Sequence, residues 1–237
     1  MKYELINKPN NNFSAIQQIL YNRGIAEKDI LHYLNLSDND INSPLLLGEE
    51  NLKQGLFAIL HAIQFNQKAV IIVDCDCDGY TSAALLINYL YKIFPTWVIN
   101  YVNWYMHDSK QHGLSDCFDS IIEKNPSLVI CPDSSSNDYK YHKLLKEKNI
   151  NVLVLDHHLA EKISDDAIII NNQLSNYPNK ELSGVGVVWQ FCRFIDMVLE
   201  KDYANDFLDL VALGNCADMM SLRSMETRYL ITKGFKR

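Results

Sequence analysis

Two short acidic motifs stand out in this sequence of 237 residues. Positions 74–79 read Asp-Cys-Asp-Cys-Asp-Gly, and positions 156–158 read Asp-His-His. Each motif directly follows an apolar run, at 69–73 and at 151–155, which is typical of a buried strand. Carboxylates and imidazoles at the ends of buried strands are costly to place unless they bind a cation. The two motifs together therefore predict a metal site, and with it an enzyme.

The aspartates of the first motif are predicted to act together. In an extended segment alternate residues face the same way, so Asp74, Asp76 and Asp78 would share one face while the cysteines point into packing. Three negative charges this close raise one another's pKa unless a cation offsets them. Gly79 then lets the backbone turn into a helix, which residues 81–82 would cap. A solvated acidic loop is the alternative, and the preceding buried strand argues against it.

The second motif places two imidazoles beside a carboxylate. One histidine can bind a metal through one ring nitrogen, while the neighbouring carboxylate orients a ring. The other histidine then remains available for a phosphate oxygen or for proton transfer. A polar connection between a strand and a helix is the alternative, and the presence of the first motif argues against it.

Two further aspartates extend the predicted site. Asp133 follows the apolar run 128–131, so it occupies the same strand-end position as the motifs and is the natural candidate to bridge two metals. The serines after it and Asn137 are expected to cap the next helix rather than to do chemistry. Asp218 follows an apolar helix, and it is a candidate metal ligand only in combination with the other motifs.

The periodicity of apolar residues predicts an α/β fold, with a parallel β-sheet covered by helices on both faces. Strands are expected at 69–73, 97–102, 128–131, 151–155 and 167–170. Helices are expected at 49–66, 80–93, 115–124 and 137–148, followed by a helical C-terminal part at 183–200, 203–213 and 224–235. Residues 1–48 are predicted to form a helical N-terminal segment and residues 49–237 the domain with the motifs. Ligands of open parallel sheets bind beyond the carboxyl ends of the strands, where the motif aspartates stand.

Composition narrows the classes of function. The formal net charge of −7 argues against a nucleic-acid partner, although two divalent cations in the aspartate cluster would offset part of it. A hydrophobic content of 48% provides a substantial core and argues against disorder. No apolar run is long enough to span a membrane, and the first residues lack a signal-peptide pattern, so we expect a cytoplasmic protein. No C-x-x-C pair occurs, which excludes a zinc ribbon.

The motif set resembles the DHH phosphoesterase superfamily, and within it most closely the RecJ-type single-strand-specific 5′-exonucleases. The residues that carry the resemblance are Asp74-x-Asp76-x-Asp78-Gly79-x-Thr81-Ser82, the strand-end Asp133, Asp156-His157-His158 and the late Gly-x-x-Ala-Asp that ends at Asp218. Segments 112–115 and 183–187 are also similar to that group. The resemblance covers roughly residues 50–237.

This resemblance implies two divalent ions, usually Mn²⁺, with Mg²⁺ as the alternative. Asp76 and Asp133 would hold one ion. The residues implied for the other ion are Asp78, Asp133, His157 and Asp218. Asp74 would support the first site and His158 would contact the scissile phosphate, so the implied catalytic residues are His158, Asp74 and Asp133.

The substrate implied by the resemblance is single-stranded DNA or an oligonucleotide, degraded 5′ to 3′ in DNA repair, recombination or replication. Arg228 matches a position in a family motif and would bind phosphate. His107 stands where the family has an arginine that meets the nucleic-acid backbone, and His112 and His158 complete the predicted substrate-binding set. The aromatic-rich segment around Trp104 would either stack bases or pack within the fold.

Two departures from the family pattern leave alternatives open. Ile72 stands where the family often has a histidine, so the first metal site lacks one ligand of the pattern. The family's second domain, of the DHHA1 type, is expected to be absent, in which case a protein partner or a second chain would complete the substrate cleft. The alternatives are a phosphodiesterase of short oligonucleotides or cyclic dinucleotides, and an inactive scaffold that binds a replication or repair partner.

Overall fold

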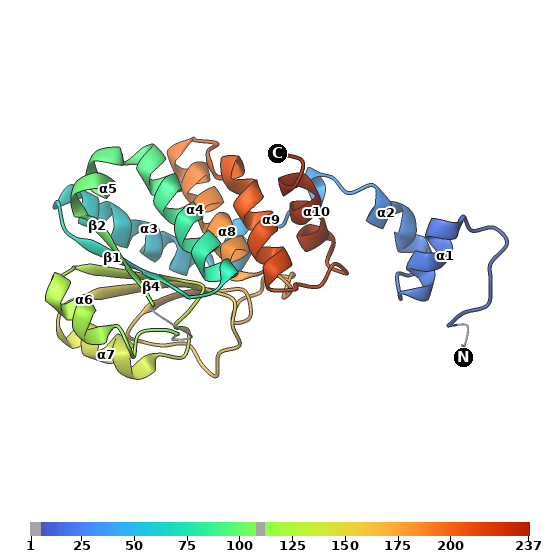
Figure 1. Cartoon of the computed structure of the whole chain (residues 1–237). Helices are drawn as coiled ribbons and strands as arrows, with labels where there is room; N and C mark the ends of the chain where they lie inside the picture. Colours follow the sequence, from blue (N-terminus) through green and yellow to red (C-terminus); the bar gives the residue numbers. More distant parts are fainter. Residues whose placement is uncertain (1–5, 108–111) are drawn as a thin grey trace. The chain divides into compact units, whose positions relative to one another are not determined.

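The computed structural model describes residues 6–107 and 112–237 (Figure 1). The chain divides into two compact units, Met1–Ile41 and Asn42–Arg237. The predicted division into residues 1–48 and 49–237 stays a prediction, because contact density alone does not define a folding unit. Among the described residues, no helix is both long and apolar enough to cross a bilayer.

The first unit is helical in its described part, as predicted for the N-terminal segment. Its elements are α1 (Ala15–Asn22), η1 (Glu27–Asp29), α2 (Ile30–Leu34) and η2 (Asp38–Asp40). The side chain of Ser14 accepts a hydrogen bond from the backbone N–H of Gln17 at the start of α1, and the Gln17 side chain accepts one from the N–H of Ser14. This reciprocal pair satisfies backbone groups that a helix leaves open at its first turn.

A five-stranded parallel sheet forms the centre of the second unit. Its strands are β1 (Ala69–Val73), β2 (Val102–Met106), β3 (Leu128–Pro132), β4 (Asn151–Asp156) and β5 (Ile168–Asn171). Their spatial order is β2-β1-β3-β4-β5, and every pairing between neighbours is parallel. Every residue of β1 and of β3 is buried, as expected where helices cover both faces. The predicted fold class is confirmed.

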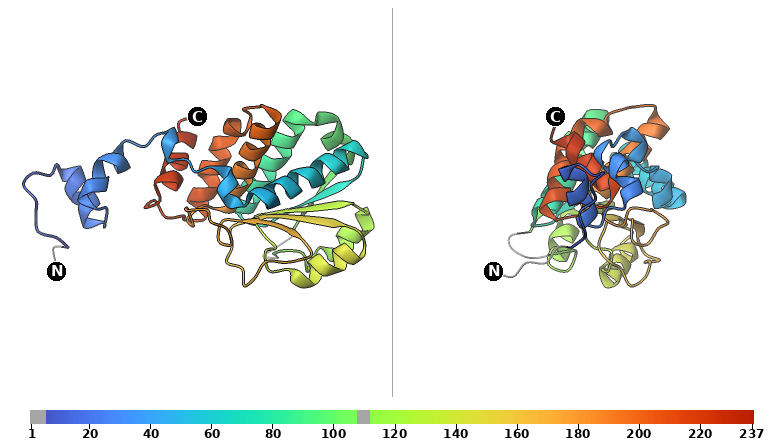
Figure 2. Two further views of the ribbon diagram at one scale, coloured as in Figure 1. Left: turned by 180° about the vertical axis from the view of Figure 1, so that it is seen from behind. Right: turned by 90° about the vertical axis from the view of Figure 1, so that its right-hand side faces the viewer.

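Helices cover the two faces of this sheet (Figures 1 and 2). The helices α3 (Glu49–Gln64), α4 (Cys77–Ile93) and α8 (Gly184–Leu199) lie against one face, and α6 (Phe118–Lys124) and α7 (Tyr139–Glu147) against the other. Beyond α4 and α8 pack α9 (Leu208–Ala217) and then α10 (Met225–Gly234). The remaining elements are η3 (Pro44–Leu47), α5 (Pro95–Tyr101) and η4 (Ala204–Phe207).

Alternate residues of the strands enter two separate layers of the core. Val70 and Ile72 pack with Ile121 of α6 and Leu145 of α7. On the other face, Leu153 of β4 lies close to α3 and α8, because its Cδ1 atom is 3.0 Å from the position that a Cβ on Gly55 would take. This alternation fixes which strand-end side chains point toward which layer.

The prediction of a strand at 97–102 is wrong. This segment belongs to α5, which begins at Pro95, and the edge strand β2 follows it at Val102–Met106. Trp97 is buried and its indole N–H donates to the carbonyl of Gln67, whereas Ile99 is 67% exposed. A short apolar run has the same appearance in a strand and in a buried helical turn, so periodicity did not separate the two.

Two predicted helix caps are also wrong. Helix α4 begins earlier than predicted, and its N-cap is Asp76, whose Oδ1 atom accepts a hydrogen bond of 2.8 Å from the N–H of Gly79. The hydroxyl of Thr81 instead donates to carbonyl groups within the first turn. The amide of Asn137 donates to the carbonyl of Leu159 and forms no cap of α7.

The register of the sheet places the ends of its central strands at one edge. Ile71 of β1 pairs with Ile130 of β3, and Pro132 of β3 pairs with Leu155 of β4. The residues that follow these strands, from β1, β3 and β4, therefore emerge side by side. The three predicted strand-end motifs meet at this carboxyl edge, which the N-terminus of α8 also approaches.

Gly184, the first residue of α8, makes this close approach sterically feasible. A Cβ atom at position 184 would lie 2.2 Å from Oδ1 and 2.5 Å from Cγ of Asp133, far inside van der Waals contact. The helix therefore reaches the carboxyl edge only because residue 184 has no side chain.

We expect Gly184→Ala to lower the melting temperature by several degrees, since overpacking costs about 1–3 kcal/mol and each kcal/mol shifts the melting temperature of a chain of this size by about 2–4 °C. Thermal unfolding followed by circular dichroism measures the shift. Gly55→Ala is the matched control, because the nearest atoms to its Cβ are side-chain atoms 3.0 Å or more away. An equal shift in both variants would contradict the steric explanation.

Candidate metal centre

Three predicted carboxylate ligands surround the ring of His157, which is the fourth predicted ligand. Its Nε2 atom lies 3.3 Å from Oδ1 of Asp133, 3.6 Å from Oδ2 of Asp218 and 3.8 Å from Oδ2 of Asp78. The imidazole is 10% exposed, whereas the side chain of Asp218 is 36% exposed, so the group opens to solvent on the side of Asp218. Asp78, His157 and Asp218 offer ligand atoms that all lie within 4.8 Å of one another.

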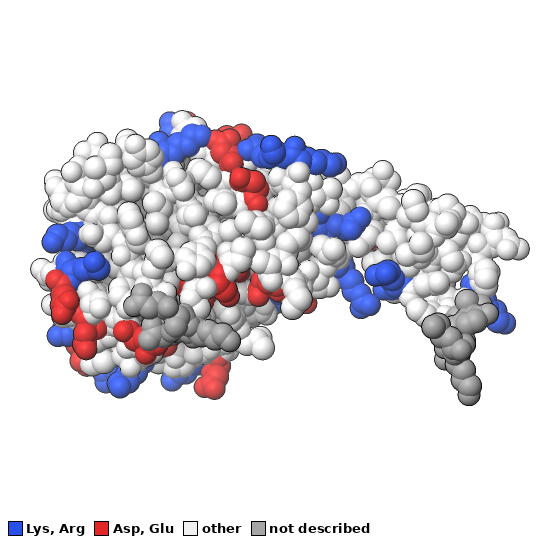
Figure 3. Space-filling model, in the orientation of Figure 1, with Lys and Arg blue, Asp and Glu red and all other residues white. Residues whose placement is uncertain are grey.

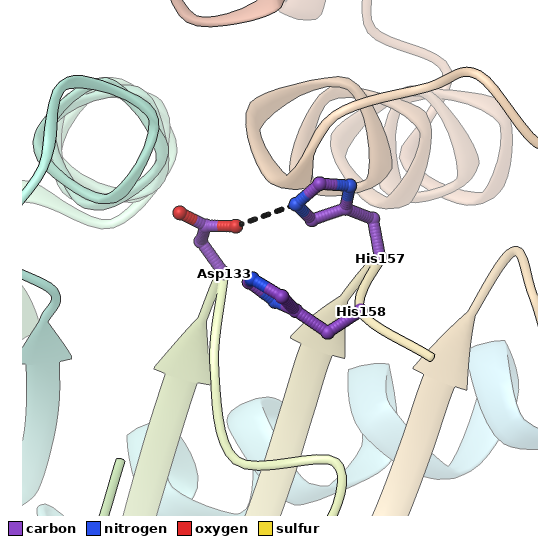
Figure 4. Close-up of side chains that lie close together, drawn as sticks. All are labelled: Asp133, His157 and His158. Atoms are coloured by element: carbon purple, nitrogen blue, oxygen red, sulfur yellow. Dashed lines mark ion pairs between the residues drawn. The ribbon is translucent and has the colours of Figure 1, made fainter. Parts of the chain in front are cut away.

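A second cluster consists of carboxylates and includes Asp133 again. Asp74, Asp76 and Asp133 offer oxygen atoms within 4.8 Å of one another, and Asp74 and Asp133 are buried while Asp76 is exposed. Asp133 also groups with His157 and His158 by the same criterion. Figure 4 shows these three side chains at the ends of neighbouring strands, with Asp133 pointing toward the ring of His157. Asp133 therefore lies where the two clusters meet.

The backbone holds Asp133 in an uncommon conformation. Its φ angle is +63°, in the left-handed region that aspartate tolerates better than most residues, and its N–H donates to the carbonyl of Leu155 at 2.8 Å. The side chain is 1% exposed, and among the described residues its Oδ1 atom has no hydrogen-bond partner. Burial raises its pKa well above the usual range, and the charges of Asp78 and Asp156 raise it further.

Asp78 is held by the start of α8. Its Oδ2 atom accepts a hydrogen bond of 2.6 Å from the N–H of Gly184, and Oδ1 accepts one of 3.1 Å from the N–H of Val185. These amides carry the positive end of the helix dipole, which favours a carboxylate. Burial nevertheless raises the pKa of Asp78, and the hydrogen bonds and His157 only partly oppose that rise.

Asp156 acts behind the cluster by orienting His158. Its Oδ1 atom accepts a hydrogen bond of 2.8 Å from Nδ1 of His158 and another from the N–H of His157. Its Oδ2 atom accepts one from the N–H of Ser136. Burial alone would raise the pKa of Asp156, but the bonds from His158 and Ser136 hold it below its usual range. The same bond raises the pKa of His158, whose ring is 45% exposed. The ring is thus fixed through Nδ1, and Nε2 is its remaining nitrogen.

The outer residues of the predicted site occupy different environments. Nδ1 of His112 lies 2.6 Å from Oδ2 of Asp74, and the rings of His112 and His158 are 5.2 Å apart, so His112 stands beside the cluster. His107, at the end of β2, is only 4% exposed. Arg228 is half-buried on α10, which packs against α9, the helix that Asp218 caps. The binding roles of these side chains stay predictions.

The structure brings several of the predicted site residues together, but the sequence did not predict how they are held. The expectation that Asp74, Asp76 and Asp78 share one face of an extended segment is wrong, because Asp78 already lies in the first turn of α4. The N–H groups of Gly184 and Val185 were not predicted as partners of Asp78. The close approach of Gly184 to Asp133 was not predicted either. No short sequence motif predicts a contact of this kind between segments that are distant in the sequence.

Comparisons with known proteins agree with this geometry. Residues 68–215 match the model described as DHH family, N-terminal domain. Over its full length the chain is 38% identical to the SPbeta prophage-derived protein YorK of Bacillus subtilis (strain 168), whose name refers to single-strand DNA-specific exonuclease activity. The chain is 30% identical over 230 residues, 94% of its length, to the single-stranded-DNA-specific exonuclease RecJ of the same organism. It spans 40% of YorK and 28% of that RecJ.

A solved structure shares the fold. An exonuclease RecJ bound to manganese matches with a TM-score of 0.69 at 20% identity, over 79% of this chain and 48% of that one. At this identity the match concerns the fold, which places a parallel sheet and its covering helices in the same arrangement.

We expect Asp133→Asn to raise the stability of the metal-free protein at neutral pH and to abolish its stabilisation by Mn²⁺. A buried carboxyl with a raised pKa stabilises the fold while protonated, fully below the ordinary value of 3.8, and this contribution is lost as pH rises through the folded-state value. The amide carries no charge to desolvate, but it also cannot replace a bridging carboxylate.

Differential scanning fluorimetry with and without Mn²⁺ checks both effects. Asp119→Asn on α6 is the matched control, because it removes one exposed negative charge that belongs to none of the ligand clusters. If the variant at position 133 is still stabilised by Mn²⁺ as strongly as the parent protein, Asp133 is not a metal ligand.

We expect Asp156→Asn to lower the pKa of His158 in the metal-free protein. The carboxylate stabilises the imidazolium through its hydrogen bond, so its neutralisation makes proton loss from the ring occur at lower pH. Titration of the ring signals by NMR measures the change, with the partly exposed His61 in the last turn of α3 as an internal control that should not move. An unchanged pKa for His158 would show that the bond does not govern its charge.

Proposed function

Because the chain belongs to the DHH family, we propose that it is a metal-dependent phosphoesterase that degrades single-stranded DNA from the 5′ end. One observation carries this proposal: Asp133 lies where two groups of metal-ligand side chains meet, with the ring nitrogen of His157 within 3.8 Å of three carboxylates. Such a shared carboxylate is the arrangement that two-metal phosphoester hydrolysis requires.

Two divalent ions fit the donors that the chain presents. Buried Oδ1 atoms of Asp74 and Asp133 have no hydrogen-bond partner among the described residues, which is costly unless a cation binds them. We assign Asp76 and Asp133, supported by Asp74, to one ion. To the other we assign Asp78, Asp133, His157 and Asp218. The mixture of carboxylate and imidazole favours Mn²⁺ over Mg²⁺. Bound ions supply Lewis acidity to phosphoryl and water oxygens.

The chain's own residues bind and orient the phosphodiester. Nδ1 of His158 is held by Asp156, so Nε2 of this half-exposed ring is directed to bind a phosphate oxygen. The raised pKa of His158 favours the imidazolium, which donates to an anionic oxygen more strongly than neutral imidazole. Hydrolysis then adds the oxygen of water to phosphorus, breaks the bond to the leaving oxygen and transfers a proton to it. We assign substrate contacts to His107, His112 and Arg228 as well.

The relatives' names support the choice of substrate, because both refer to single-stranded DNA. We infer a role in DNA repair, recombination or replication in the cytoplasm. The chain spans 40% of YorK, so the activity of that whole relative is carried over to this chain only as a proposal.

Incubation with Mn²⁺ and end-labelled substrates tests the function. We expect progressive shortening of 3′-labelled single-stranded DNA, immediate release of the label from 5′-labelled strands, little cleavage of duplex DNA, and loss of cleavage after chelation or in His157→Ala. Cleavage of short oligonucleotides or cyclic dinucleotides alone would support the smaller-substrate alternative, which the net charge of −7 favours. Failure to cleave any phosphodiester with Mn²⁺ bound would contradict the proposed enzymatic activity. It would favour the alternative of an inactive scaffold that binds a partner.

A further inference from the structure

We propose that Trp104 and Met106, two exposed side chains of the edge strand β2, form a stacking surface for bases a few nucleotides away from the scissile phosphate. This inference rests on the proposed function, because it concerns the polynucleotide that the metal centre would cleave. It assigns the aromatic segment before His107, for which the sequence left stacking and internal packing as alternatives, to stacking.

The side chains of Trp104 and Met106 project from the same side of β2, since they are two residues apart in a strand. Trp104 is 56% exposed and Met106 is 50% exposed, whereas Tyr105 between them packs against the buried cluster under α6. Internal packing therefore accounts for Tyr105 but not for its two neighbours. The strand is the edge of the sheet, so no further strand of the described chain covers it.

The register connects this surface to the metal centre. Met106 pairs with Val73, the residue before Asp74, and Trp104 pairs with Ile71. Neighbouring strands lie about 4.8 Å apart and residues rise about 3.3 Å each, so Trp104 lies one strand across and roughly 10 Å back from Asp74. A strand of nucleic acid bound at the metals reaches this surface within a few nucleotides.

The chemistry of the surface fits bases better than phosphates. In Figure 3 few charged side chains lie over the middle of α4, and the acidic side chains on this face stand in several separate places. With a net charge of −7, this protein gains little from counterion release along the whole DNA backbone. An exposed indole instead stacks on any base, because every base has a π-face, and the thioether of methionine contacts aromatic rings favourably.

Trp104 offers a direct spectroscopic test. The other two tryptophans are buried, Trp97 at 4% and Trp189 at 0% exposure, so the long-wavelength emission belongs to Trp104. We expect octathymidylate with phosphorothioate linkages to quench this emission in the Mn²⁺-loaded protein. Trp104→Phe should abolish the quenching while keeping most of the affinity, since phenylalanine still stacks.

Binding and kinetics complete the test. We expect Trp104→Ala to raise the Kd for octathymidylate about tenfold, as measured by fluorescence anisotropy of a labelled oligonucleotide. It should raise KM for this length but leave the hydrolysis of a dinucleotide unchanged, because a dinucleotide does not reach the surface. Phe57→Ala is the matched control, since Phe57 is 68% exposed on α3 and should alter neither value.

The outcomes separate this inference from the proposed function. Quenching without any hydrolysis would support the stacking surface and contradict the nuclease. Hydrolysis with an unchanged Kd in Trp104→Ala would overturn the stacking surface alone. A change in oligomeric state of this variant, seen by light scattering with the Kd unchanged, would also overturn it and identify the surface as a protein interface.

Discussion

Mutual repulsion among buried carboxylates at the carboxyl edge of one sheet is the constraint around which this fold is arranged. Asp74, Asp78, Asp133 and Asp156 are each at most 3% exposed, and they lie at the ends of three neighbouring strands or in the helix that follows. Burial of so much like charge without compensation costs several kcal/mol for each ion. The compensating groups come from everywhere else: amides of α8, backbone N–H groups after β4, and the imidazole rings of His112, His157 and His158.

The buried carboxylates are stabilised to different degrees, and this difference matches the roles that we propose for them. Asp156 is satisfied by hydrogen bonds and has a lowered pKa, so it is a stable anchor for His158. Asp133 has the opposite character, with a raised pKa and an Oδ1 atom that accepts no hydrogen bond within the described part of the chain, although Nε2 of His157 lies 3.3 Å from it. The fold thus satisfies the carboxylate that orients a ring and leaves unsatisfied the carboxylate that we assign to both ions. A site of this kind exchanges stability of the metal-free chain for affinity toward cations.

The sequence predicted the sheet, and which strand-end residues lie close together, more accurately than the local connections. Strands β1, β3 and β4 are continuous apolar runs that end in acidic residues, and their parallel packing follows from the alternation with helices. The cap of α4, which is Asp76 and not Thr81, was harder to predict. A cap depends on where a helix starts, and the first turn of α4 overlaps the motif itself. The contact between Gly184 and Asp133 was beyond sequence reasoning, since it depends on how closely two distant segments approach. Strand β2 was displaced by several residues because α5 has an equally apolar beginning.

The register of the parallel strands also has a kinetic meaning. The proposed ligands emerge from β1, β3, β4 and α9, so no single hairpin or helix pair contains a complete cluster. Strand pairings between distant segments form late in folding because their loop closure is entropically costly. A shift of one residue between β3 and β4 would turn Asp133 or His157 to the opposite face. A cation bound at the proposed site would therefore stabilise the correctly paired strands relative to misregistered arrangements.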